Sequence, residues 1–209
     1  MNIFNSLFCK AVIPASCLVL AGLGGCAVVD QRIGLTYSRP DQPLVRHSGD
    51  ITVTRVASQP AAKNSTGEWI IGSLNNAHDV HQADLLSDRS PEEWISDALL
   101  QELRQAGYTV SFAEKLPAAV VRGIALTNVQ AFLTVTKGAV SADTRNELKF
   151  NAEVFLNGDK VKTLTVAARN DRTVPLDASQ KEKERIMLQS LRDAMQQIIP
   201  EITILIDKK

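Results

Sequence analysis

A turn signature between two alternating segments constrains the fold of this chain more than any other feature. Apolar and polar residues alternate over 148–156, and the alternation returns at Leu164, Val166 and Ala168. A period of two places one side of a strand on the core. The intervening sequence, Asn-Gly-Asp at 157–159, favours the tight turns that join antiparallel strands. We therefore predict an antiparallel hairpin at this place.

Further segments have strand patterns of the same kind. The longest is a β-branched, alternating run over 120–135, which a short loop at 137–143 separates from the hairpin. Together these segments predict an antiparallel meander. Shorter strands are predicted at 50–58, 68–72 and 108–112.

Two amphipathic helices are predicted from apolar residues spaced three and four apart. The first begins at Ser90-Pro91-Glu92-Glu93, where serine caps and proline suits the first turn, and it ends at Gly107. The second begins after Asp177 or Ser179, either of which can cap it. Pro200 should end or kink it, so that 202–206 either packs as a tail or continues the helix.

These elements predict an α+β class fold, a two-layer domain in which two helices cover one face of an antiparallel sheet. We assign residues 50–209 to this domain and residues 26–49 to a tether, in which 33–37 could pair as an edge strand. Residues 1 to about 49 are then expected to be dispensable for folding.

The N-terminal 25 residues have the pattern of a lipoprotein signal peptide. Lys10 supplies the positive charge, and an uncharged apolar run over 11–24 follows it, too short for a comfortable membrane span. The run ends in Leu-Gly-Gly-Cys, which resembles the bacterial lipobox and makes Cys26 the lipidation site. Cys17 is a weaker candidate because Pro14 stands three residues before it. An ordinary secretory leader is the alternative.

Lipidation at Cys26 predicts a membrane anchor. Each buried methylene contributes roughly 0.8 kcal/mol, so the usual three acyl chains, such as palmitate, hold a protein essentially permanently. Ala27 occupies the position at which aspartate retains lipoproteins in the inner membrane of enteric bacteria. We therefore expect a lipid anchor in the outer membrane, with the domain on the periplasmic side.

Charge and cysteine content exclude several classes of function. Lys plus Arg and Asp plus Glu number 23 each, so no overall field attracts nucleic acid. All 3 cysteines, Cys9, Cys17 and Cys26, precede the predicted domain, which removes thiol catalysis and cysteine-ligated metals from it. No nucleotide-binding, zinc-protease or serine-hydrolase motif occurs, and we expect neither catalytic residues nor a cofactor.

A few polar residues permit two interpretations each. His78 and His81, with Asp79 and Asp84, either hold a metal or belong to a solvated polar loop, and the loop is favoured because a third ligand would have to come from elsewhere. The remaining cases favour structural roles: Glu92 and Glu93 as first-turn acids, 181–185 as an exposed helix face, and Trp69 and Trp94 as core residues rather than a sugar platform.

The chain resembles the YajG-type lipoproteins, and it is similar to the auxiliary lipoproteins of ABC-type envelope transport systems. The resemblance rests on the lipobox, the helix that ends in Leu-Arg-Gln-Ala-Gly-Tyr at 103–108, and the late hairpin before a terminal helix. It implies a small periplasmic α+β domain that acts as a non-enzymatic envelope component.

The leading hypothesis is a lipid-anchored, non-enzymatic binding or accessory subunit with an envelope protein as partner, one form being a transport auxiliary. The first candidate surface is the polar stretch 78–89. A hydrolase or metal-dependent protein with dispersed residues is the alternative, and a purely structural lipoprotein is the third.

Overall fold

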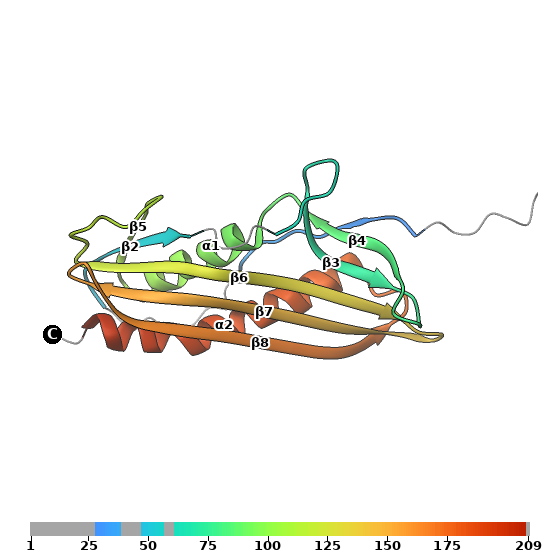
Figure 1. The fold of residues 1–209 in the computed structure, drawn as a ribbon. Coiled ribbons are helices and arrows are strands. Elements are labelled where there is room, and N and C mark those ends of the chain that lie inside the picture. Colours follow the sequence, from blue (N-terminus) through green and yellow to red (C-terminus); the bar gives the residue numbers. More distant parts are fainter. Residues whose placement is uncertain (1–27, 39–46, 57–60, 208–209) are drawn as a thin grey trace, which may run out of the picture.

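The computed structural model describes residues 28–38, 47–56 and 61–207. In these residues a sheet of 8 strands is covered on one face by two helices (Figure 1), so the predicted α+β class is confirmed. In chain order the elements are β1 (Gln31–Arg32), β2 (Asp50–Arg55), β3 (Trp69–Asn75), β4 (His81–Ser87), α1 (Pro91–Gln105), β5 (Thr109–Phe112), β6 (Arg122–Lys137), β7 (Ser141–Leu156), β8 (Asp159–Pro175) and α2 (Gln180–Asp207).

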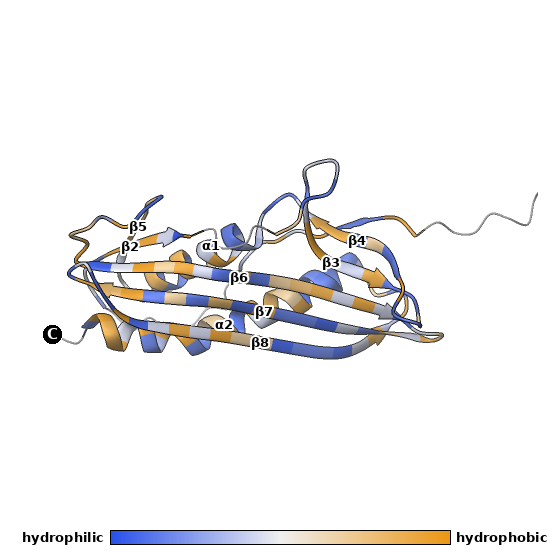
Figure 2. Ribbon diagram, viewed as in Figure 1, coloured by the Kyte–Doolittle hydropathy of each residue, from blue (hydrophilic) through white to orange (hydrophobic). Residues whose placement is uncertain are grey.

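The long antiparallel strands β6, β7 and β8 form a ribbon in which β7 is the middle strand and β8 an edge. Asn157 and Gly158 both have positive φ, 51° and 86°, as the predicted tight turn requires, and the hairpin that they close is confirmed. Buried and exposed residues alternate along most of β7 and along the second half of β6, whereas most of β8 is exposed. Figure 2 shows hydrophobic and hydrophilic residues interspersed along these strands. β6 ends at Lys137 and β7 begins at Ser141, so the loop that was predicted at 137–143 is shortened to residues 138–140.

The sheet is mixed, and the prediction of an antiparallel sheet was wrong. β2 pairs in parallel with β5 and with β6, β3 pairs in parallel with β6, and β1 with β4. The first half of β6 contacts β2 and its second half contacts β3, so two smaller groups of strands share one edge of the ribbon. Period-two alternation reports which face of a strand is buried, but not the direction of its partner.

The prediction of a polar loop at 78–89 was also wrong, because most of this stretch is strand β4. β4 pairs on one side with β3 and on the other with β1. Leu85 and Leu86 are buried in the core, and His81 and Gln82 are exposed. The sequence His-Gln-Ala-Asp-Leu-Leu-Ser does not alternate, because Leu85, Leu86 and Ser87 are buried one after another, which requires that both faces of the strand are covered there.

Both helices begin as predicted. The side chain of Ser90 accepts a hydrogen bond from the backbone N–H of Glu93 at 3.1 Å, and that of Ser179 accepts one from Glu182 at 3.3 Å. Gly107, with φ 104°, follows the end of α1. α2 runs through Pro200 to Asp207 rather than ending there, because Ile198, Ile202 and Ile206 continue one buried stripe.

The segment before β2 is packed into the domain. Ile33, Leu35 and Tyr37 are at most 6% exposed, and the N–H of Ile33 donates to the carbonyl of Leu86. The hydroxyl of Tyr37 also hydrogen bonds to the buried carboxylate of Glu102 in α1. These contacts favour a folded domain that starts before residue 50. The edge strand that was expected at 33–37 lies earlier, at β1, and of residues 33–37 only Ile33 extends this pairing.

Candidate functional site

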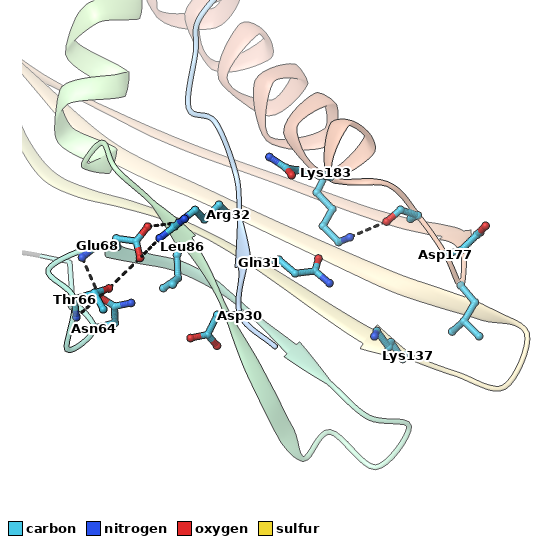
Figure 3. A pocket seen from close by; sticks show the side chains of 13 residues that line it. Asp30, Gln31, Arg32, Asn64, Thr66, Glu68, Leu86, Lys137, Asp177 and Lys183 are labelled. Atoms are coloured by element: carbon cyan, nitrogen blue, oxygen red, sulfur yellow. Dashed lines mark hydrogen bonds and ion pairs between the residues drawn. The ribbon is translucent and has the colours of Figure 1, made fainter. Parts of the chain in front are cut away.

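A cavity of about 740 Å³ lies at the end of the molecule where β1, β6 and the start of α2 meet (Figure 3). Its walls come from segments far apart in the chain, so it exists only in the folded domain. The lining residues are Asp30, Gln31, Arg32, Asn64, Thr66, Glu68, Leu86, Lys137, Leu176, Asp177, Ala178, Gln180 and Lys183.

One wall is an ion pair held by a tight loop. Nε of Arg32 lies 2.6 Å from Oε1 of Glu68, and the hydroxyl of Thr66 donates to the other carboxylate oxygen at 2.9 Å. Asn64 accepts hydrogen bonds from the backbone of Thr66 and Glu68, which orders the loop through a turn at Gly67. The pKa of the Glu68 carboxyl is lowered, mainly by the hydrogen bond that it accepts from Arg32. This wall is therefore internally neutralised.

The opposite wall carries two lysines with a different environment. Lys183, in the first turn of α2, is only 5% exposed, and its Nζ donates to the backbone carbonyl of Ala178 at 2.7 Å. Burial, and to a smaller extent the charge of Lys137, lowers the pKa of Lys183. Among the described residues no carboxylate oxygen lies within 4.0 Å of either ammonium group. Most buried lysines in proteins are paired with an acid.

The expectation that 181–185 forms a simple exposed helix face was wrong for Lys183. Alternating charges indicated a solvated surface, whereas the β8–α2 connection folds over this lysine. Glu184 also contacts the segment before β2: its Oε1 accepts a hydrogen bond from the N–H of Gly34 at 2.9 Å. These contacts arise only when the chain folds, so the local charge pattern at 181–185 could not predict them.

The histidine and aspartate candidates are not gathered into one site. Nε2 of His81 lies 2.8 Å from Oδ1 of Asp84, but Asp79 accepts a hydrogen bond from Thr136 on β6. His78 is exposed in the turn between β3 and β4. No group of three or more potential metal ligands occurs among the residues that the structure describes.

The two tryptophans and the two first-turn acids mostly lie where structural roles would place them. Trp94 is 1% exposed, as expected for a core residue, whereas Trp69 is half-buried and carries Nζ of Lys63 over its ring at 4.1 Å. Glu93 lies 3.8 Å from Arg55, and Glu92 is half-buried in the first turn of α1.

The predicted lipidation site, Cys26, lies outside the described residues, as do Cys9, Cys17 and the rest of the predicted signal peptide. The first described residue, Val28, follows Cys26 by two positions. Within the described part of the chain, neither helix combines the length and hydrophobicity that a membrane span needs.

Comparison with known proteins assigns the chain to no family. No protein-family model matches it, and no curated protein matches it in sequence. Among solved structures it is similar to protein XCC0632 from Xanthomonas campestris, of the DUF330 family, at 8% identity, with coverage of 83% of this chain and 95% of that chain and a TM-score of 0.48.

Two lipoproteins are among the other similar structures. The minor lipoprotein from Acinetobacter baumannii is 10% identical over 74% of this chain and 92% of its own, with a TM-score of 0.45. The rare lipoprotein B from Shewanella oneidensis is 10% identical over 64% of this chain and 97% of its own, with a TM-score of 0.35. The finding is thus a similarity to small bacterial lipoproteins.

Proposed function

We propose that this protein is a lipid-anchored, non-enzymatic binding or accessory subunit of the bacterial cell envelope, held in the outer membrane with its domain on the periplasmic side. Lipidation at Cys26 provides the anchor. One structural observation carries the binding role: β8, which is 17 residues long, pairs with β7 alone among the described strands. Its outer edge therefore offers backbone N–H and C=O groups to another extended chain.

The composition of β8 restricts where a partner can pair. Lys160 and Lys162 stand at its beginning and Pro175 at its end, and such residues discourage unselective pairing at sheet edges. Between the charged parts lies an uncharged stretch, Thr-Leu-Thr-Val-Ala-Ala at 163–168. We propose that an extended segment of an envelope protein adds to the sheet at this stretch.

Charge placed on this edge tests the proposal. Thr165 and Ala167 are exposed, so lysine at both positions should leave the core intact while it disfavours strand addition. We expect Thr165→Lys with Ala167→Lys to reduce site-specific photo-crosslinking from position 163 to a discrete partner in cells. Val140→Lys, in the exposed turn between β6 and β7, is the control. Equal crosslinking in the edge variant and the control would show that β8 is not the docking edge.

A further inference from the structure

The arrangement of charges in the cavity points to a ligand. Arg32 and Glu68 neutralise each other across one wall, but Lys137 and Lys183 have no acidic partner within 4.0 Å among the described residues. Both lysines line the cavity, and Figure 3 shows Lys183 extending from α2, with its ammonium group bonded to the backbone carbonyl of Ala178. A buried ammonium group without a counter-ion is costly, and an anion between the two lysines would remove that penalty.

The acids that line the cavity do not serve as this counter-ion. Oδ1 of Asp30 accepts a hydrogen bond from the backbone N–H of Asp84 at 2.9 Å, on the side of β4. Asp177 lines the wall near Lys183, yet its carboxylate is not within 4.0 Å of either ammonium group. The lysine side of the cavity is thus locally positive, although the whole chain has no net charge.

The neighbouring backbone adds to this preference. Lys183 lies in the first turn of a 28-residue helix, where aligned peptide dipoles favour an anion. Nζ of Lys183 uses one of its three N–H groups on the carbonyl of Ala178, and the ammonium has two further donors. The ammonium group of lysine is a compact charge, so it can bind a single phosphate oxygen and does not need the planar, bidentate acceptor that arginine prefers.

The position of the cavity identifies the source of the phosphate. Asp30, Gln31 and Arg32 line the cavity and follow Cys26 by four to six residues. A chain of that length spans at most about 20 Å, so an acyl anchor at Cys26 holds the cavity close to the headgroups of its leaflet. This step rests on the lipid anchor of the proposed function.

We propose that this cavity binds the phosphate of an anionic phospholipid headgroup, with Lys183 and Lys137 as its cationic contacts. The anchor brings the headgroup within reach, and the lysine wall selects it. The domain then sits on the membrane in one orientation, with the end of the sheet that carries the cavity facing the bilayer.

Native mass spectrometry of the acylated protein in nonionic detergent tests this inference. Phosphatidylglycerol or phosphatidylcholine is added, and bound lipid is read as added mass. We expect one phosphatidylglycerol molecule per chain and about tenfold less phosphatidylcholine. In the double variant Lys183→Met with Lys137→Gln, we expect about tenfold less phosphatidylglycerol. The matched control is Lys115→Gln with Lys149→Gln, which removes two charges from exposed positions.

The outcomes separate the pocket from the anchor and from folding. Equal retention in the two double variants, or equal retention of the two lipids, would overturn the pocket. Displacement of phosphatidylglycerol by an equal concentration of inorganic phosphate would show that the site recognises a free ion instead of a lipid. The protein mass reports acylation separately, so a missing anchor is recognised by itself. The two single variants exclude loss of lipid binding through misfolding. Lys183→Met keeps the side-chain volume without the charge, and it is compared with Lys137→Gln, whose position is only half-buried.

Discussion

The hydroxyl of Tyr108 donates a hydrogen bond to Oδ1 of Asp207 at 2.9 Å and so joins the end of α1 to the last turn of α2. His47 stacks on the ring of Tyr108, with 5.3 Å between centroids, and its Nδ1 lies 2.6 Å from Oδ2 of the same aspartate. Three segments that are distant in sequence therefore meet at the end of the domain opposite the cavity.

This contact predicts a pH dependence of stability. Burial is the largest cause that raises the pKa of Tyr108, and the hydrogen bond to Asp207 is the next. As the pH rises above about 10, the unfolded state loses the phenolic proton while the folded state keeps it, so stability falls. We expect Tyr108→Phe to remove this fall. Urea unfolding of both proteins between pH 8 and about 11 measures it, and a difference between them that does not change with pH would contradict the assignment.

Leu35 tests whether the N-terminal segment belongs to the folded domain. Its side chain is 1% exposed, and Leu→Ala substitutions at buried positions typically cost about 2–5 kcal/mol. We expect Leu35→Ala to lower the free energy of unfolding within this range, and the exposed neighbour variant Thr36→Ala to change it by less than about 0.5 kcal/mol.

A truncation addresses the same segment. A chain that starts at His47 lacks Ile33, Leu35 and Tyr37 and should be less stable than one that starts at Ala27. Equal denaturant midpoints for the two chains would support the expectation that the first 49 residues are dispensable for folding.

Gly72 lies where β3 packs tightly against β6. A Cβ atom at this position would lie 2.2 Å from the backbone oxygen of Leu133 and 2.8 Å from Cδ1 of Leu85. Because a backbone atom cannot move aside cheaply, we expect Gly72→Ala to destabilise the domain by about 3 kcal/mol, the upper end of the overpacking range. Gly34→Ala, whose nearest contact is a flexible side-chain oxygen at 3.4 Å, should be nearly neutral. Comparable thermal midpoints would show that β3 can shift.

Cys26→Ser tests the anchor. Serine has no sulfur to accept the diacylglyceryl group, so we expect loss of acylation and release of the protein from the membrane. Metabolic labelling with a fatty-acid probe measures acylation, and Cys17→Ser should retain the label. Label that persists in Cys26→Ser and disappears in Cys17→Ser would assign lipidation to the other cysteine.

Local signals in the sequence predicted local structure well. Ser90, Ser179 and the Asn157–Gly158 turn act within a few residues, and the structure has each of them where the pattern placed it. Their physical basis is a backbone N–H that needs an acceptor or a φ that glycine and asparagine tolerate.

Relations between distant segments were not predictable in the same way. The parallel direction of β2 and β6 depends on where α1 and the loops return the chain, and β4 is a strand because β1 and β3 flank it. The cavity was missed for the same reason, since Lys183 is buried by the preceding connection and lies near Lys137 only in the folded state.

The hydrogen bond between Gly34 and Glu184, which are 150 positions apart, imposes an order on folding. Arg192 likewise donates to the backbone carbonyl of Ser38 across 154 positions. A ribosome adds about 5–20 residues per second, so the segment around Gly34 waits roughly 8–30 s before its partners in α2 exist. During that interval the segment can reach β4 and α1 but not α2, so one side of it stays uncovered, and a chaperone that shields nascent apolar segments would have its longest opportunity there.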